Sequence, residues 1–478
     1  MWFRSDLRIS DNTALSRAAA AGEVVGLFVV SPGEWSSHDL APVRVDLMLR
    51  TVSELAEGLG KLNIPLLVVR AETGRDVPRL VLEVARRSGC DGLFFNREYE
   101  IDEAKRDEAT TELFGEAGLK TEGCTDQVVL APGDVRTGEG RAFTVFTPFK
   151  RAWIRVLQER GAGACAAAPR KQGVVAMDVP QPWRVVSDCI EGFDSAIDAK
   201  LWPAGEGEAR RRLNRFVAKR IEGYEAGRNA PADDATSVLS PYLAIGAISP
   251  RQCLNAAIEA NPVERGSALD SGNPGVTCWI SELIWREFYV HVAAAFPRVC
   301  MGRAFKPATE RIAWRRDKAE FKRWQEGRTG FPIVDAGMRQ LSATGWMHNR
   351  LRMITAMFLT KDLLIDWRWG ERHFMRSLVD GFFASNNGGW QWSASTGTDA
   401  APYFRIFNPT SQSRTSDPRG EYIRRWVPEL AGLDGDEIHD PSSLPPLARA
   451  GLEYPEPMVE HAKARDRVMA AFGAIRPE

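Results

Sequence analysis

The sequence predicts an α/β domain with a parallel, Rossmann-like sheet, joined by a long connector to an all-α domain. Two observations carry this prediction. Short apolar runs alternate with helical patterns in the first 125 residues, and helical patterns dominate from residue 206 onward. At 478 residues and 44% hydrophobic content, the chain can bury more than one core. We therefore divide it into residues 1–125, 126–205 and 206–478.

Three apolar runs in the first segment have the length and composition of strands buried on both faces. They cover residues 23–30, 65–70 and 92–96. Helical patterns at 46–59 and 77–88 separate them, an order that predicts βαβ units and a parallel sheet. No G-x-G-x-x-G motif follows the first strand, so we expect no conventional dinucleotide site on this sheet.

The middle segment differs from its neighbours. Residues 161–170 and 179–183 are rich in Pro, Gly and Ala, and the segment shows little periodicity, which indicates a connector. In the last segment two helical patterns, at about 278–296 and 346–364, contain the most unusual polar residues.

The cysteines and the hydropathy of the sequence indicate the cellular compartment of the protein. Seven scattered cysteines without a C-x-x-C pair favour reduced thiols and argue against a disulfide framework or a zinc site. No apolar run is long enough to span a bilayer, and the N-terminus lacks signal-peptide features. We expect a cytoplasmic protein, associated with the nucleoid if DNA is its partner, and we assign no metal site.

Charge is unevenly distributed along the chain. The formal net charge is −1, but residues 300–376 contain 16 Lys/Arg against 8 Asp/Glu. A local positive surface is what phosphate recognition requires. Composition alone favours the alternative, a set of solvated helix faces.

Helical spacing brings chemically distinct side chains together. Trp279, Glu282 and Arg286 fall within an arc of about 60° on one helix. Asn349 and Met353, four residues apart, share a face of the other helix. The first set is either an exposed ion pair or a pocket wall, and the second is either core or a site.

Two segments carry a family resemblance. Residues 386–399 read NNGGWQWSASTGTD, and residues 346–353 read WMHNRLRM. Together they resemble the flavin-binding half of the DNA photolyase and cryptochrome family, closest to the class I cyclobutane pyrimidine dimer photolyases. Residues 2–8 (WFRSDLR) and 146–153 (FTPFKRAW) are also similar to the family. Relatives have more apolar residues before that first tryptophan, so either the start is truncated or the first strand is short.

The resemblance implies FAD, bound in a U-shape within the helical domain. A hydroxyl-rich turn near a helix start suits the pyrophosphate. The residues that match the family's FAD contacts are Tyr224, Thr236, Ser237, Val238, Leu239, Ser240, Trp279, Arg286, Arg352, Asp380 and Asn386. Asn386 matches the position that faces flavin N5, where a neutral amide accompanies repair and an aspartate accompanies sensing in plant-type cryptochromes.

The sequence departs from the family pattern at two of these places. Phe382 stands where a second acid is usual after Asp380-Gly381, and Val238 stands where an arginine is usual in the phosphate turn. The first change removes a polar contact near the flavin. Neither removes a reacting group.

The resemblance implies light-driven repair of cyclobutane pyrimidine dimers in DNA by a monomeric enzyme. Reduced FAD, excited by light, donates an electron to a lesion flipped out of the duplex. The residues implied at the reacting centre are Glu282, Asn349, Met353 and Asn386. Those implied in lesion stacking and DNA contact are Arg228, Trp285, Arg350, Trp392 and Arg405.

The resemblance also implies an electron relay and an antenna. Trp390, Trp367 and Trp314 match a tryptophan chain from the flavin to the surface, although tryptophans most often serve core packing. An antenna pigment, 5,10-methenyltetrahydrofolate in preference to a deazaflavin, is expected near the residues that match its site: Trp35, His38, Asp102, Glu103 and Cys300. Met301 replaces a lysine that is usual there.

Three alternative functions fit these residues less well. A cryptochrome-type photoreceptor keeps the flavin but signals through a partner, and the chain shows no long tail after the family-like core. A (6-4) photoproduct photolyase usually has a histidine pair near the pocket, whereas Asn349 follows His348 here. A DNA-binding module without catalysis has no use for a buried flavin site.

Overall fold

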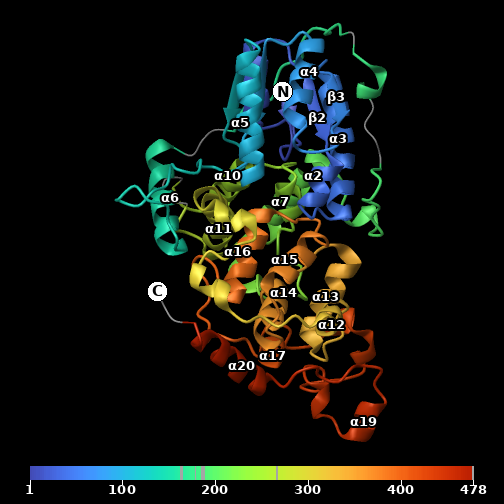
Figure 1. Ribbon diagram of the computed structural model, residues 1–478. Helices are drawn as coiled ribbons and strands as arrows, with labels where there is room; N and C mark the ends of the chain where they lie inside the picture. Colours follow the sequence, from blue (N-terminus) through green and yellow to red (C-terminus); the bar gives the residue numbers. More distant parts are fainter. Residues whose placement is uncertain (162–164, 178, 185–188, 265–266, 268, 476–478) are drawn as a thin grey trace. The chain divides into compact units, whose positions relative to one another are not determined.

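The computed structural model describes residues 1–478 except 162–164, 178, 185–188, 265–266, 268 and 476–478. Within this part the chain forms two compact units, both drawn in Figure 1. The first comprises Met1–Glu225, Ser237–Pro297 and Val379–Ala384, and the second comprises Ala226–Thr236, Arg298–Leu378 and Ser385–Glu478. These units divide the chain differently from the three segments predicted from sequence, and that three-part division stays a prediction.

Five strands in the described residues form one parallel sheet in the first unit, in the order β3-β2-β1-β4-β5. They are β1 (Trp2–Phe3), β2 (Gly26–Val30), β3 (Leu66–Arg70), β4 (Gly92–Asn96) and β5 (Lys120–Cys124). Every residue of β1 and β2 is buried, as expected of a parallel sheet covered on both faces. The predicted fold class is confirmed.

Helices between the strands cover this sheet. They are α1 (Thr13–Ala21), α2 (Pro32–Ser37), α3 (Pro42–Lys61), α4 (Val77–Arg87) and α5 (Ile101–Glu116). α4 turns Val77, Val81 and Ala85 inward, a spacing of four that forms one apolar face. These side chains belong to the same core as the strand residues Leu67 and Phe95. α3 and α4 can be followed beside β2 and β3 in Figure 1.

Ion pairs occupy the carboxyl edge of the sheet where the strand order changes direction, between β1 and β4. Arg4 follows β1 and is ion-paired with Glu98, 3.6 Å away, and with Asp107. Arg106 lies 2.6 Å from the same Glu98. Burial alone would raise the pKa of Glu98, but Arg4 and Arg106 lower it to about 2. This edge is therefore filled by charged side chains that are paired with one another.

Further helices complete the first unit. They are α6 (Phe146–Arg160), α7 (Gly205–Lys219), α9 (Ser240–Ala244), α10 (Pro250–Ala260) and α11 (Pro274–Ala295), with α8 (Tyr224–Gly227) at its boundary. Buried Asp126 accepts hydrogen bonds from Arg8, at 2.5 Å, and from Arg251 on α10, at 2.7 Å. This charge network ties the segment after β5 to the segment after β1 and to α10, all within the first unit.

The predicted connector contains a full helix, which the sequence reading missed. In α6, Phe146, Phe149 and Trp153 are buried and share a face. Their helical spacing was obscured by Pro148, which stands in the first turn, where proline is tolerated. Parts of the connector at 162–164, 178 and 185–188 lie outside the described residues.

One buried carboxylate fixes this connector to α11. Glu287 accepts hydrogen bonds from the backbone N–H groups of Val129 and Leu130 at 2.7 and 2.8 Å, and from Trp153 Nε1 at 2.5 Å. Burial raises the pKa of Glu287 to about 7, against the lowering effect of these donors. The connector is therefore held by hydrogen bonds to a helix that carries predicted site residues.

The second unit is helical. Its helices are α12 (Lys318–Gln325), α13 (Pro332–Thr344), α14 (Asn349–Met357), α15 (Trp367–Met375), α17 (Pro409–Ser416), α18 (Glu421–Trp426), α19 (Pro446–Ala450) and α20 (His461–Gly473). α16 (Phe383–Ala394) begins in the last segment of the first unit. A core that includes Trp324, Met357 and Tyr422 joins the helices.

Short helical turns link these elements. The 3₁₀ turns are Gln181–Arg184, Ala199–Leu201, Ile221–Gly223, Pro297–Met301, Pro307–Arg311, Pro428–Leu430 and Pro441–Ser443. None of the described helices combines the length and apolar character needed to cross a membrane.

The single helix predicted at 346–364 is wrong in its extent. Its α-helical part begins at Asn349, because His348 Nδ1 accepts the backbone N–H of Arg350 and caps the first turn. After Met357 the backbone becomes a π-helical turn, Phe358–Asp362. A π turn inserts a residue into the helical pattern, so the apolar period in the sequence does not reveal it.

Candidate functional site

α11 positions four predicted site residues of the first unit: Trp279, Glu282, Trp285 and Arg286. Asn273 caps it by accepting the backbone N–H of Val276 at 3.1 Å, and Pro274 occupies the first turn, so the helix starts four residues before the predicted bound. Trp279 is buried, whereas Glu282 and Arg286 are half-buried. The expected shared face is therefore a partly accessible one.

Arg286 is held by two partners from separate parts of the first unit. Its Nη1 donates to the carbonyl oxygen of Gln127 at 2.7 Å, and its guanidinium lies 4.6 Å from the ring centroid of Phe382. Burial lowers the pKa of Arg286. Phe382, which stands in place of the family's usual acid, thus supports Arg286 by a cation–π contact.

The aromatic side chains of Tyr224, Phe216 and Trp279 form a row. Phe216 meets Tyr224 edge-on at 5.8 Å between ring centroids and Trp279 at 5.0 Å with a tilt of 47°. Two predicted FAD contacts are therefore linked through Phe216, which the sequence reading did not single out.

The phosphate turn is joined to Asp380. Ser240 Oγ donates to Asp380 Oδ2 at 2.5 Å, and Asp380 is buried. Val238 adopts the left-handed backbone region, with φ +49°, which is strained for a β-branched residue. Of the other turn residues, Leu239 is buried, Ser237 is half-buried, and Thr236 belongs to the second unit.

The indole of Trp285 is fixed by its neighbours. It stacks on Phe146 of α6, with centroids 3.6 Å apart and planes within 9°, and it contacts Phe288 edge-on. Trp285 is half-buried. A rigid, partly accessible indole of this kind can stack against a base at little entropic cost.

In the second unit, α14 presents Asn349 and Met353. Asn349 is exposed at the first helical position, and Met353 is half-buried one turn later. Arg352 Nε donates to the carbonyl oxygen of Met347 at 2.8 Å, which turns this side chain back along the helix. The predicted shared face of Asn349 and Met353 is present.

Three arginines predicted to contact DNA act on one another electrostatically. Arg350 Nε donates to Asn229 Oδ1 at 3.2 Å. Burial first, and then Arg228 and Arg405, lower the pKa of Arg350. The positive charges of Arg228 and Arg405 thus act on Arg350, and guanidinium groups are suited to phosphate oxygens.

Asn386 is oriented by α15. Its Nδ2 donates to the carbonyl oxygen of Glu371 at 3.0 Å, so its Oδ1 remains as an acceptor. Asn387 Nδ2 donates to Glu371 Oε1 at 2.7 Å, and Gln391 Nε2 donates to Asn387 Oδ1 at 2.9 Å. The sequence gives no sign of the role of Glu371, because nothing in its local pattern marks it, whereas Gln391 lies within the NNGGWQW motif but was given no role.

The three relay tryptophans share one core. Trp390 and Trp367 are buried within the main core of the second unit, and Trp314 packs at its margin, half-buried. Trp390 meets Phe374 edge-on at 4.9 Å and Trp324 at 6.1 Å. Half-buried Trp392 also packs against this core.

The predicted antenna residues of the first unit are ion-paired. His38 Nδ1 lies 3.2 Å from Glu103 Oε1, and its Nε2 lies 3.4 Å from Asp102 Oδ2. The hydrogen bond with Glu103 outweighs burial and raises the pKa of His38 to about 9. Trp35 is buried nearby in sequence, and Cys300 lies in the second unit.

Glu34, His38 and Glu103 have ligand atoms within 4.8 Å of one another, a spacing that a metal ion could use. Glu34 is already bound to Arg106, at 2.7 Å, and His38 to Glu103. The group is therefore balanced by its own charges, and we assign no metal to it.

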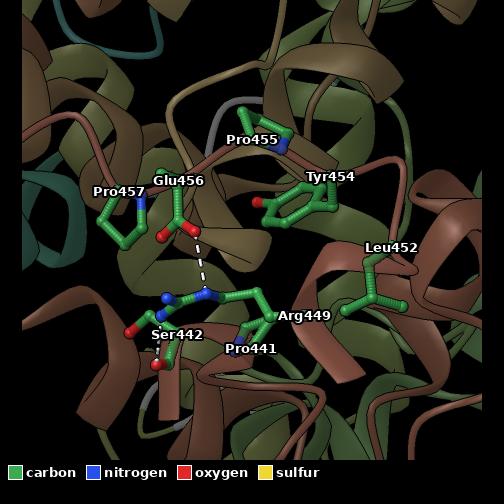
Figure 2. A pocket seen from close by; sticks show the side chains of 9 residues that line it. Pro441, Ser442, Arg449, Leu452, Tyr454, Pro455, Glu456 and Pro457 are labelled. Atoms are coloured by element: carbon green, nitrogen blue, oxygen red, sulfur yellow. Dashed lines mark hydrogen bonds and ion pairs between the residues drawn. The ribbon is translucent and has the colours of Figure 1, made fainter. Parts of the chain in front are cut away.

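A small cavity lies elsewhere in the second unit. Figure 2 shows its wall, where Arg449 is ion-paired with Glu456 at 2.8 Å beside Tyr454 and Pro457. Its volume is about 10 Å³, the space of one water molecule. None of the predicted site residues lines it, and it is too small for a cofactor.

Comparisons with known proteins agree along the whole chain. Residues 1–170 match the family described as DNA photolyase, and residues 279–474 match the FAD binding domain of DNA photolyase. The chain is 45% identical to the deoxyribodipyrimidine photo-lyase of Salmonella typhimurium over 478 residues, which cover 100% of this chain and 98% of that protein.

Two solved structures of a photolyase and a cryptochrome are similar to nearly the whole chain. A bacterial class III photolyase from Agrobacterium tumefaciens is 35% identical, with a TM-score of 0.85, and the match covers 99% of this chain and 96% of that one. A Synechocystis cryptochrome is 27% identical, with a TM-score of 0.87 and coverage of 98% of both chains.

Proposed function

The chain belongs to the DNA photolyase family, and we propose that it is an FAD-dependent enzyme that splits cyclobutane pyrimidine dimers in DNA under light. The observation that carries this proposal is the 45% identity to a deoxyribodipyrimidine photo-lyase along the entire chain. Such a match covers both the sheet and the helical part.

The predicted cofactor residues fit FAD by their chemistry. Arginines and hydroxyls suit a pyrophosphate: Arg286 is fixed by Gln127 and Phe382, and Ser240 is fixed by Asp380. Asn386 keeps an acceptor oxygen for a protonated ring nitrogen, because its amide nitrogen is bound to Glu371. Bound FAD, reduced and excited by light, supplies an electron that opens the cyclobutane ring and then returns.

The chain's residues bind and orient the lesion. We propose that the dimer is flipped out of the duplex, which costs less for a lesion than for an intact pair. Trp285 and Trp392 stack against it, Glu282 and Asn349 hydrogen-bond the thymine edges, and Met353 fills the remaining apolar contact. Arg228, Arg350 and Arg405, whose charges act at Arg350, hold the DNA backbone in this proposal. We also propose that the enzyme acts as a monomer.

We further propose a folate antenna near His38, Asp102, Glu103 and Cys300. A pterin ring presents N–H donors, and the carboxylate of Glu103 is the matching acceptor. This carboxylate is half-buried, and His38 holds its pKa below the usual range even though burial opposes the shift. It is therefore ionised at neutral pH, as an acceptor must be.

Glu282→Ala tests the substrate side. We expect chemically reduced Glu282→Ala enzyme to keep its FAD but to repair dimers about tenfold less per absorbed photon, since a hydrogen bond to a charged group contributes roughly 1.5 kcal/mol. The measurement is recovery of thymines from a dimer-containing oligonucleotide under near-UV light. Glu259→Ala, an exposed change on α10, is the control and should repair normally.

Two results would contradict the proposal. If the wild-type enzyme repaired (6-4) photoproducts but not dimers, its substrate would be the other class of lesion. Bound FAD with no repair of either lesion, under light and reductant, would favour a photoreceptor such as the cryptochrome to which the chain is structurally similar.

A further inference from the structure

Lys361 is a fully buried amine in the π-helical turn Phe358–Asp362. Its Nζ donates to Ser395 Oγ at 2.7 Å and to the carbonyl oxygen of Ala394 at 3.4 Å, and it lies 4.2 Å from the ring centroid of Phe472 on α20. π turns are rare and frequently occur at functional sites. A lysine is seldom buried unless it is paired with a negative charge.

No carboxylate in the described residues lies within ion-pair distance of Lys361. The neighbouring Asp362 is engaged elsewhere: its Oδ1 is bound to His461 at 2.6 Å, and its carbonyl oxygen accepts from Arg467. Burial first, and then the charge of Lys306, lower the pKa of Lys361 to about 7. Lys306 in turn interacts with Asp399.

Lys361 is linked to Trp314, the outer end of the predicted relay, through a single ring, that of Phe472. Ala394, to which it donates, ends α16 one turn after Trp390. Phe472, which it faces, also packs edge-on against Trp314 at 6.3 Å. The strand-like pairing of Arg315 with Ile365 brings the segment that follows the π turn next to Trp314.

We propose that Lys361 is an electrostatic gate for electron transfer from Trp314 to Trp390, a role that rests on the relay in the proposed function. In this step one electron leaves Trp314 and, by way of Trp367, fills the vacancy on Trp390, so Trp314 is oxidised and both Trp367 and Trp390 are restored. No bond is broken, and Lys361 itself is neither oxidised nor reduced.

The sign of the effect follows from Coulomb's law. A positive ammonium group next to the Phe472 ring opposes positive charge on Trp314, whereas a neutral amine does not. Electron transfer from Trp314 should therefore be less complete below pH 7 and more complete above it. The expected change across neutral pH is about three- to tenfold in the yield of oxidised Trp314, given the screened charge interactions typical of proteins.

Two substitutions imitate the neutral and the charged state of the Lys361 side chain. Lys361→Met fixes the neutral state, so the yield of oxidised Trp314 should match the high-pH value of the wild type at every pH. Lys361→Arg fixes the charged state and should give the low-pH value throughout. Transient absorption of the tryptophan radical between pH 6 and pH 9 measures the yield. Lys322→Met, on the exposed face of α12, is the control and should keep the wild-type profile.

The titration of Lys361 can be tested without light or cofactor, through the pH dependence of the free energy of unfolding. A lysine with a folded-state pKa near 7 and a higher unfolded-state pKa makes the unfolded chain bind more protons between these values. The free energy of unfolding should therefore rise with pH above 7. In Lys361→Met this contribution is absent, whereas a wild-type slope in that variant would overturn the proposal.

Repair by chemically reduced enzyme separates this proposal from the function it rests on. Wild type, Lys361→Met and Lys361→Arg should repair dimers equally, because repair does not use the relay. If none of them repairs dimers, the proposed function fails. If all repair dimers but the radical yield has the same pH profile in all three, the gate alone fails.

Discussion

A single hydrogen bond sets the orientation of the Asn386 side-chain amide. Donation from Nδ2 to the carbonyl oxygen of Glu371 leaves Oδ1 as the free acceptor, the atom required opposite a protonated flavin nitrogen. The sequence predicts the importance of Asn386 through the NNGGWQW motif. It could not predict Glu371, because a contact across fifteen residues arises only when α15 and α16 pack together.

The contact made by Phe382 could not be predicted from the sequence either. In the sequence it is an apolar residue where relatives have an acid, and its effect cannot be read from that change. In the structure its ring lies against the guanidinium of Arg286, so a cation–π contact stands where a carboxylate contact was expected.

Trp390→Phe should block photoreduction of oxidised enzyme while leaving repair by chemically reduced enzyme largely intact. The substituted ring fills most of the same space but is much harder to oxidise, so the first electron transfer to the cofactor is lost. The matched control is Trp324→Phe, since Trp324 is equally buried and contacts Trp390 at 6.1 Å but has no predicted relay role. Equal photoreduction in both variants would show that Trp390 serves packing alone.

At the scale of elements, α11 depends on its cap. It carries Trp279, Glu282, Trp285 and Arg286, and Asn273 satisfies an N–H group at its start. Sequence periodicity located this helix but set its start four residues late, because caps act through side-chain hydrogen bonds outside the apolar pattern. The π turn after α14 was missed for a related reason: it shifts the period without changing composition.

Asn273→Ala should lower the free energy of unfolding by about 1 kcal/mol, the usual contribution of a helix cap. Chemical denaturation monitored by circular dichroism measures it. Asn273→Asp restores an acceptor at the helix start and should recover most of the loss. If Asp destabilises as much as Ala, the cap hydrogen bond at Val276 is not the source.

At the scale of the whole molecule, the order of elements in sequence was enough to predict the fold class. Alternating buried runs and helices led to the parallel sheet, and the helical remainder was identified by its period. The helix α6 within the connector was not found, because Pro148 and the flanking Gly- and Ala-rich residues hide its apolar face. Nor could sequence show that Glu287 binds the connector to α11, or that Asp126 accepts a hydrogen bond from Arg251 of α10.

Glu103→Ala should abolish a near-UV absorption band additional to that of flavin, while dimer repair by directly excited, reduced enzyme persists. The reason is the loss of an ionised acceptor for the pterin, and Glu108→Ala, an exposed change on the same helix, is the control. Absorption spectra after folate supplementation measure the band. A band at longer wavelength, typical of a deazaflavin, would contradict the antenna assignment.

Sheets with this strand order ordinarily hold a ligand in the crevice beyond the first and fourth strands. Here a nucleotide phosphate entering that crevice would compete with Glu98 for Arg4 and Arg106. It would leave Glu98 buried without a counter-charge, at a cost of about 3–5 kcal/mol. The crevice is thus filled by its own ion pairs, and admitting a nucleotide would require Glu98 and its two arginines to be replaced together.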